Sequence, residues 1–249
     1  MKFSVITAVY NGKKFLPRLM ASLHRQSYPH WEWIVQDGGS TDGTLDLLRA
    51  WDDPRVRPVS EPDTGVYDAW NKAVRRATGH WALFLGADDA LLHPHTLAQC
   101  CRHLRRLPDA VELAFGALFQ GKDGQPRTVC DRSLSAVYRQ FFSNMGLAFP
   151  ATFARLSLLR REPFDPRYRI AGDFDWAARV LTGHNLARLP VAVSYMELGG
   201  MSSGRDRTLQ DERRRVLRTR IAPKADAFMA ASREYSLEEK IPLEPFAAH

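Results

Sequence analysis

An alternation of short apolar runs with apolar residues at helical spacing fills the first 90 residues, and it limits the possible folds more than any other feature of the chain. The expected strands are Phe3–Val9, Trp31–Val35, Val56–Ser60 and Trp81–Leu85. The expected helices between them cover residues 15–23, 45–51 and 67–77. This repeated alternation predicts an α/β fold with a mainly parallel sheet flanked by helices on both faces.

The second half of the chain is less regular. Helical spacing covers residues 95–106 and 175–181, and strand-like runs cover residues 111–119, the segment around Val129, and residues 186–195. Gly121–Gly124 has the composition of a hairpin turn, and Gly199–Gly204 that of a flexible loop. With 249 residues, we expect one domain over residues 1–204 and a basic, helical C-terminal extension over residues 205–249 packed on it.

Composition is that of an ordinary globular protein, with 45% hydrophobic and 25% charged residues. Three cysteines, two of them adjacent, are a poor disulfide framework and favour a reducing compartment. The apolar start continues into Asn11-Gly12-Lys13 without a cleavage site, so we interpret it as a buried strand. No run reaches the roughly 18 apolar residues of a membrane span. We therefore expect a cytoplasmic protein.

The net charge of +7 is concentrated near the C-terminus, where residues 205–220 hold seven arginines and three acids. The simplest interpretation is a solvated helix face. There are two alternatives. The arginines could attract anionic lipid headgroups, with peripheral contact at the inner face of the cell membrane, or they could attract a pyrophosphate-bearing substrate. The sequence has no aromatic stacking platform or zinc signature, so we expect no nucleic-acid partner.

Polar segments follow each of the four expected strands, and three of them contain acids. Ligands of parallel sheets bind beyond the carboxyl ends of the strands, so these segments should converge on one edge. Asp88 and Asp89 follow the fourth strand, and carboxylates together with substrate phosphates are common ligands of Mg²⁺ and Mn²⁺. A turn or a helix cap is the alternative explanation of this pair.

Two further segments supply candidate ligand contacts. Asp37 begins a glycine-rich turn, where its carboxylate can accept a hydrogen bond from a ribose or a base, although the glycines also suit a tight connection. Asp68 and Asn71 are three residues apart and share a face of the third helix, where Asp68 could equally complement the helix dipole.

Four of these segments, in this order and spacing, resemble the motifs of family 2 glycosyltransferases with the GT-A fold. They are Ser4–Asn11, Asp37–Thr44, Gly65–Asn71 and Phe84–Asp89. The resemblance resumes at Gly172–Trp176 and Gly199–Ser202, and it is greatest for enzymes that build bacterial surface polysaccharides, such as colanic-acid-type transferases. It implies a Rossmann-like, mixed and mainly parallel sheet.

The resemblance also implies roles for individual residues. Thr7, Ala8 and Tyr10 would line the pocket of the nucleotide base, and Asp37 would contact the base or the ribose. Asp88 would hold the ribose or the sugar, and Asp89 would bind a divalent cation, Mn²⁺ or Mg²⁺, that bridges the diphosphate. The additional donor contacts would be Asp63, Asp68 and Asn71.

The catalytic base of the family commonly lies in a Glu-Asp pair before a helix. This chain has Gly172 at the glutamate position, so Asp173 becomes the expected base and Asp175 its competitor. A helix N-cap is the alternative explanation of Asp173. Processive members carry Q-x-x-R-W, whereas the segment Gln210–Arg214 has no tryptophan, which favours transfer of one sugar per encounter.

These features predict an inverting, metal-dependent hexosyltransferase that moves a sugar from a nucleoside-diphosphate sugar to a hydroxyl acceptor. A UDP-sugar is the favoured donor and a GDP-sugar the alternative, with a glycan or lipid-linked acceptor in surface polysaccharide or glycolipid synthesis. The Gly199–Gly204 loop would close over the donor. The rival interpretations are a non-catalytic nucleotide-sugar binding module and a metal-dependent phosphohydrolase or nucleotidyltransferase.

Overall fold

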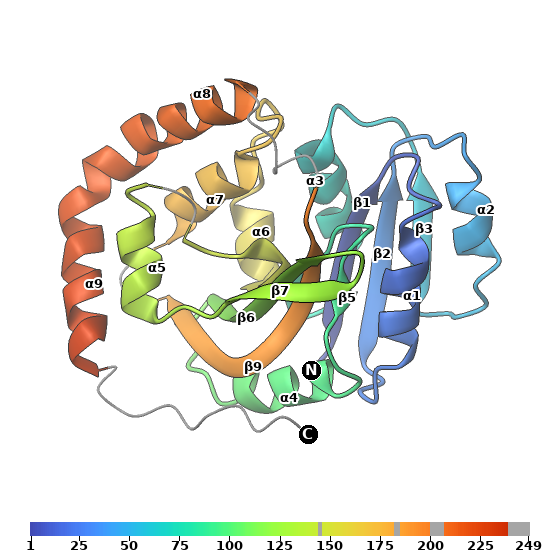
Figure 1. Cartoon of the computed structure of the whole chain (residues 1–249), viewed down its shortest axis with the longest axis horizontal. Coiled ribbons are helices and arrows are strands. Elements are labelled where there is room, and N and C mark those ends of the chain that lie inside the picture. Colours follow the sequence, from blue (N-terminus) through green and yellow to red (C-terminus); the bar gives the residue numbers. More distant parts are fainter. Residues whose placement is uncertain (144–145, 182–184, 200–206, 239–249) are drawn as a thin grey trace.

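In the computed structural model, the described part of the chain comprises residues 1–143, 146–181, 185–199 and 207–238, with side chains described up to residue 234 (Figure 1). The strands are β1 Phe3–Val9, β2 Trp31–Asp37, β3 Val56–Ser60, β4 Trp81–Phe84, β5 Ala90–Leu91, β6 Leu113–Lys122, β7 Gln125–Cys130, β8 Thr152–Arg155 and β9 Leu186–Glu197. The α-helices are α1 Leu16–His24, α2 Thr44–Arg49, α3 Val66–Arg76, α4 Thr96–Leu104, α5 Leu134–Gln140, α6 Leu156–Arg161, α7 Gly172–Val180, α8 Arg207–Val216 and α9 Ala225–Glu238.

Within these residues the strands form one nine-stranded sheet with the order β3-β2-β1-β4-β8-β6-β9-β5, and β7 pairs with β6. β3, β2, β1 and β4 are parallel throughout, which confirms the α/β fold predicted from the alternating pattern. Helix α3 carries the chain from β3 across β2 and β1 to β4. The strand order therefore reverses at β1, and the carboxyl ends of β1 and β4 lie side by side, the usual place for a ligand.

The other half of the sheet is mostly antiparallel, with β6 and β9 as its parallel pair. β9 bends through a wide arc (Figure 1). The pairing of β6 with β9 shifts register around Gly116, where a Cβ atom would lie 2.3 Å from the carbonyl oxygen of Val191. A side chain at this position would block the close contact of the two strands, so glycine is required.

The predicted hairpin turn is confirmed, in a shorter form. β6 continues to Lys122 and β7 starts at Gln125, which leaves Asp123 and Gly124 as a two-residue turn. Both have left-handed backbones, with φ of 55° and 77°, as a type I′ turn requires. At the start of α2, Gly43 takes the N-cap position with φ of 85°, and the side chain of Asp42 accepts a hydrogen bond from the amide of Thr44.

Two apolar cores cover the two faces of the sheet. One joins the sheet to α1, α2 and α4, and the other joins it to α3, α5, α6 and α7. The C-terminal helices extend the second core, because Phe228 of α9 stacks on Phe141 and contacts Tyr138, with ring centroids 5.8 and 5.7 Å apart. Figure 1 shows α9 beside α5 and α8 above α7. The expected boundary between residues 204 and 205 lies outside the described residues.

Candidate active site

A cleft of about 590 Å³ opens at the carboxyl ends of β1 and β4. The end of β9, the start of α7 and one face of α8 complete its walls. Of the sequence-predicted site residues, the cleft brings together Ala8, Asp88, Asp89 and Asp173. Residues far apart in sequence therefore meet where the strand order reverses, as the sheet rule predicts.

Asp89 is a buried carboxylate at the floor of this cleft. Its side chain is 3% exposed, and it accepts a hydrogen bond of 2.6 Å from the amide of Gly86. A side chain at Gly86 would displace both carboxylates, since its Cβ would lie 2.9 Å from Oδ1 of Asp88 and 3.1 Å from Oδ2 of Asp89. Burial raises the pKa of Asp89 to about 7, and the adjacent charge of Asp88 adds to the rise. Burial also raises the pKa of Asp88.

Glu197 is a residue of the cleft that the sequence reasoning missed. Glu197 ends β9 and lines the cleft, and it is close enough to Asp88 for its charge to raise the pKa of that carboxyl. Arg18 forms an ion pair with Glu197, and the amide of Gly124 donates a 3.2 Å hydrogen bond to it. The strand expected from the sequence ended at residue 195, two residues too early. A prediction that ended at Glu197 would have placed this acid at the end of a strand, where ligands of such sheets bind.

The carboxylates of this end of the cleft suit a divalent cation that also binds phosphate. In the described ranges, no three His, Cys, Asp or Glu side chains form a complete metal cage. Asp89 has no salt-bridge partner among the described residues, and the Gly86 amide and the charge of Arg18 offset its burial only in part. A cation held by one or two carboxylates, with its remaining positions filled by a diphosphate, fits this donor set.

Asp173 also lines the cleft, from the first turn of α7. Its Oδ1 accepts hydrogen bonds from the amide of Phe174 at 2.8 Å and from the hydroxyl of Tyr67 at 3.2 Å. Burial raises the pKa of Asp173 to about 6, against the opposing effect of these two bonds. Burial also raises the pKa of Tyr67, which therefore stays protonated as a donor. A carboxylate with a pKa near 6 is ionised at neutral pH and can still accept a proton.

Gly172 packs against the ring of Tyr67. A Cβ atom at residue 172 would lie 2.7 Å from two ring carbons, so a glutamate there would collide with the tyrosine. The hydroxyl of Tyr67 shares its single proton between the carbonyl of Ile170 and Oδ1 of Asp173, and these contacts fix the ring. The ring of Tyr67, in α3, therefore explains why this chain has glycine where the family has glutamate. No local sequence pattern could reveal this contact between distant segments.

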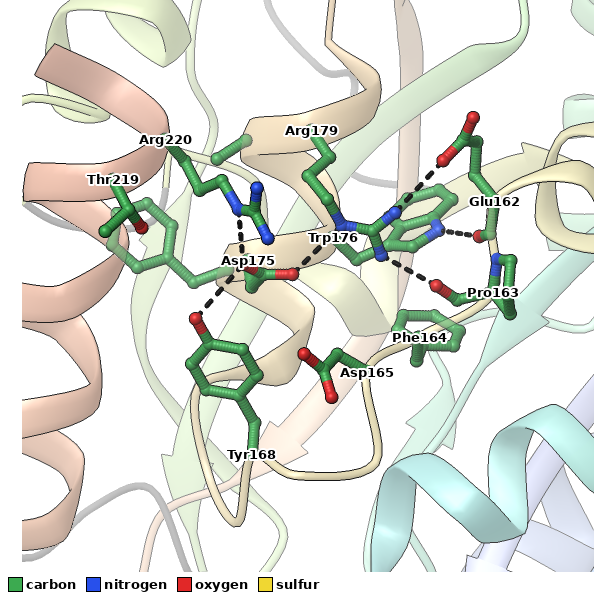
Figure 2. Close-up of polar contacts among 12 residues, drawn as sticks. Glu162, Pro163, Phe164, Asp165, Tyr168, Asp175, Trp176, Arg179, Thr219 and Arg220 are labelled. Carbon is green, nitrogen blue, oxygen red and sulfur yellow. Dashed lines mark hydrogen bonds and ion pairs between the residues drawn. The ribbon is translucent and has the colours of Figure 1, made fainter. Parts of the chain in front are cut away.

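Asp175, the competing candidate for the base, has no place among the cleft-lining residues. Its carboxylate is fully buried and accepts hydrogen bonds from Arg179 at 3.0 Å, Arg220 at 2.9 Å and Tyr168 at 3.1 Å (Figure 2). Removing either partner of a buried ion pair is strongly destabilising. This geometry assigns Asp175 to joining α7 with the segment that follows α8, a short π-helix over Leu217–Ile221.

The expected nucleotide contacts near β1 and β2 divide into two groups. Tyr10 is 67% exposed and offers an aromatic face beside the cleft residue Ala8. Thr7 and Asp37 are instead fully buried, and their side chains bond within the protein. Thr7 accepts a hydrogen bond from the indole of Trp33, and Asp37 accepts one from the hydroxyl of Ser60 at 2.6 Å.

The expected contacts on α3 also use their polar atoms within the fold. Both ends of the Asn71 side-chain amide bond the backbone of Phe164, at 2.8 and 3.0 Å. Asp68 accepts from the amide of Thr64 and pairs with Lys72 at 3.2 Å. The carboxylate of Asp63 accepts from the amide of Gly65. None of these three acid or amide side chains is among the described residues that line the cleft.

Comparison with known proteins identifies relatives of the whole fold. The family described as glycosyl transferase family 2 matches residues 4–165. A PGL/p-HBAD biosynthesis glycosyltransferase of Mycobacterium bovis is 31% identical over 214 residues, which are 81% of this chain and 79% of the relative. The putative teichuronic acid biosynthesis glycosyltransferase TuaG of Bacillus subtilis is 43% identical over 89 residues, 34% of this chain and 35% of TuaG.

Solved structures share the fold. Residues 1–349 of S. aureus TarS in complex with UDP-GlcNAc superpose with a TM-score of 0.74 at 20% identity, covering 96% of this chain and 71% of the TarS chain. Mannosyltransferase PcManGT from Pyrobaculum calidifontis, in complex with GDP-Man and Mn²⁺, gives a TM-score of 0.62 at 19% identity, covering 97% and 76%. None of the described helices combines the length and apolarity that crossing a membrane requires.

Proposed function

The chain belongs to glycosyltransferase family 2, and on this basis we propose that it transfers a sugar from a nucleoside-diphosphate sugar to an acceptor hydroxyl with inversion at the anomeric carbon. One observation carries the proposal: Asp88 and Asp89 at the end of β4 and Asp173 at the start of α7 line a single cleft. The first pair suits a cation and a diphosphate, and the third residue suits a proton acceptor.

Asp173 acts as the general base. The acceptor hydroxyl gives its proton to the free Oδ2 side of this carboxylate, while Oδ1 is held by Tyr67 and Phe174. The acceptor oxygen forms the new bond to the anomeric carbon as the bond from that carbon to the diphosphate breaks, and the nucleoside diphosphate leaves. A base positioned in this way contributes roughly 10²–10⁴-fold to the rate.

Asp89 holds a divalent cation, Mn²⁺ or Mg²⁺, with Asp88 beside the donor. When bound, the cation supplies electrostatic stabilisation of the charge that develops on the departing diphosphate. The protein's contribution is to keep the carboxylate of Asp89 buried, oriented by the Gly86 amide and free of a competing salt bridge among the described residues. PcManGT, a structural neighbour, is described with GDP-Man and Mn²⁺, which supports the assignment of a cation.

The nucleotide lies over the end of β1, against Ala8 and the exposed ring of Tyr10. Thr7 and Asp37 support this pocket through hydrogen bonds within the protein. Thr7 accepts a bond from Trp33, and Asp37 fixes the glycine-rich turn after β2 by accepting a 3.1 Å hydrogen bond from the amide of Ser40. We favour UDP over GDP, because the TarS fragment of the same fold is described with UDP-GlcNAc. Asp63, Asp68 and Asn71 then support the wall of the donor site.

The acceptor is a glycan or a lipid-linked sugar in the synthesis of a bacterial surface polysaccharide or glycolipid. The names of the relatives support this class, since they cite PGL/p-HBAD and teichuronic acid biosynthesis. A protein acting on such acceptors would work in the cytoplasm at the inner face of the membrane. The loop expected to close over the donor, residues 199–204, lies outside the described residues apart from Gly199.

The test is a screen of UDP- and GDP-sugars with Mn²⁺ or Mg²⁺, in which released nucleoside diphosphate and glycoside product are both measured. Asp89→Asn should abolish metal-dependent UDP binding. Asp173→Asn should keep UDP binding and lose transfer by at least about a hundredfold. Asp211→Asn, which removes an exposed acid on α8, is the control and should match the parent.

Three results would contradict the proposal. Donor binding without turnover with any acceptor would indicate a binding module. Release of phosphate or nucleotide products without a glycoside would indicate a phosphohydrolase or nucleotidyltransferase. Full transfer by Asp173→Asn would remove this residue from the role of base.

A further inference from the structure

Two arginines that make no hydrogen bond or salt bridge through their side chains within the described residues line the same cleft as Asp173. Arg169 precedes α7 and Arg213 belongs to α8, and both line the cleft. Across the described ranges, no hydrogen bond or salt bridge joins either guanidinium to the protein. A third cleft arginine, Arg132, donates to the carbonyl of Gly146 at 3.2 Å. Unpaired guanidinium groups in one cleft repel each other, and an anion would remove this repulsion.

Glu212 fixes the two arginines relative to each other. Its carboxylate accepts three backbone amides of the loop before α7, those of Arg169 at 2.7 Å, Ile170 at 2.9 Å and Ala171 at 2.8 Å. The loop that carries Arg169 is thereby bonded to the residue that precedes Arg213. Leu209, one helical turn before Arg213, is buried and lines the cleft as well, so this face of α8 is directed to the cleft.

The far end of the same helical segment is also held in place. Figure 2 shows Arg220, from the π-helix after α8, reaching the fully buried Asp175 of α7. Two contacts therefore hold this helical segment in place: Glu212, in the middle of α8, bonds the loop before α7, and Arg220, in the π-helix after α8, bonds α7 itself. The face of α8 that carries Leu209 and Arg213 is a fixed wall of the cleft, whereas Arg207, Arg214 and Arg215 of the same helix are exposed to solvent.

The charges of the cleft are separated along its length. Arg18 is the cation that acts on Asp88 and Asp89, whereas Arg213 is the cation that acts on Asp173. Arg169 and Arg213 thus belong to the end where the acceptor hydroxyl meets its base, away from the end that suits the cation and the donor diphosphate. Apolar residues continue the lining near them, including Leu147, Phe149 and Leu209.

We propose that Arg169 and Arg213 form a subsite for a phosphate or diphosphate group on the acceptor, which presents its hydroxyl to Asp173. The inference rests on the proposed transfer reaction and specifies the acceptor's chemistry. Guanidinium groups match phosphate oxygens with paired hydrogen bonds, and a phosphate dianion neutralises two of them. The source of the phosphate is either a lipid-linked sugar or a water-soluble polyol phosphate.

The test measures binding to the full chain saturated with UDP and Mg²⁺, so that the donor diphosphate site is already filled. Three probes are titrated calorimetrically: farnesyl phosphate, inorganic phosphate and farnesol. Both phosphates should bind, and Arg169→Gln and Arg213→Gln should each weaken this binding about tenfold or more. Arg214→Gln removes the same charge from the adjacent position of α8, where the side chain is 77% exposed, and should match the parent.

The probes also distinguish the source of the phosphate. Much tighter binding of farnesyl phosphate than of inorganic phosphate assigns the subsite to a lipid-linked acceptor, and equal binding assigns it to a water-soluble one. The proposal is overturned if UDP prevents phosphate binding, because the arginines then hold the donor. It is also overturned if farnesol binds as tightly as farnesyl phosphate, or if Arg214→Gln weakens phosphate binding as much as the other variants.

Failure of the proposed function would look different. In that case UDP itself would not bind the parent chain with Mg²⁺, whereas phosphate binding that depends on Arg169 and Arg213 would persist. Both glutamine variants should keep the UDP affinity and the unfolding midpoint of the parent, because neither guanidinium has a bonded partner among the described residues.

Discussion

Replacing Asp173 by asparagine should stabilise the fold while it removes the proposed base. The two side chains have nearly the same shape, and the asparagine oxygen can still accept from Tyr67 and Phe174. What changes is the buried charge, since burial raises the pKa of Asp173 from 3.8 to about 6. An ionised carboxylate is therefore less favourable in the folded state than in the unfolded state.

The sign and size of the effect follow from linkage between folding and protonation. The folded state binds the proton more tightly, so the penalty is absent well below pH 3.8, grows between pH 3.8 and 6, and is complete above pH 6. A shift of about two pH units corresponds to roughly 3 kcal/mol at neutral pH. Between pH 4.5 and 7.5, the stability of Asp173→Asn relative to the parent should rise by about 2 kcal/mol.

Urea unfolding of both proteins at several pH values measures this difference directly. For a chain of this size, the corresponding rise in the relative unfolding temperature is about 5 °C. A difference between variant and parent that stays constant from pH 4.5 to 7.5 would refute the reasoning, because it would mean that Asp173 titrates equally in both states. Asp211→Asn, an exposed acid on α8, should give that constant difference.

Three more outcomes are expected. In the parent, kcat/KM should rise with pH and level off above an apparent pKa near 6, because the base must be ionised; a profile flat from pH 5 to 8 would exclude Asp173. Gly172→Ala should lower the free energy of unfolding by about 1–3 kcal/mol, since the new Cβ would lie 2.7 Å from the ring of Tyr67. In a double-mutant cycle, the same substitution should cost less when Tyr67 has already been replaced by alanine. Asp175→Ala should cost about 3–5 kcal/mol in urea unfolding, because it removes a fully buried carboxylate that accepts hydrogen bonds from Arg179, Arg220 and the buried Tyr168. The folded fraction should keep UDP binding with Mn²⁺, and loss of UDP binding at full stability would contradict a structural role.

The carboxylates that the proposed reaction needs also lower the stability of the folded chain. Asp89 is a buried carboxylate and Asp173 a half-buried one, and loss of solvation is the main cause that raises their pKa values, to about 7 and about 6. The fold tolerates them because backbone amides of Gly86 and Phe174 hold each one in place. Strain and unfavourable burial of this kind concentrate at sites where ligands supply the missing interactions.

The sequence by itself determined the parallel half of the sheet and the acids at its edge. Strands and helices of the first 90 residues are long enough for their apolar period to be read, and the end of β4 placed Asp88 and Asp89 at the cleft. Short elements escaped this reading. β5 has two residues, which are too few to show a period, and the much longer β9 pairs with it. β8, which lies between β4 and β6 in the sheet, was not predicted either.

The tertiary structure alone decided which side chains the cleft contains. Asp173 and Asp175 are two residues apart on one helix, and nothing local distinguishes them; the cleft lies on one side of α7 and two arginines on the other. Tyr67 explains Gly172, and Glu212 aligns Arg169 with Arg213, through contacts between distant segments. Burial and charge pairing depend on what packs against a residue, and this packing is a property of the whole folded chain rather than of any local pattern.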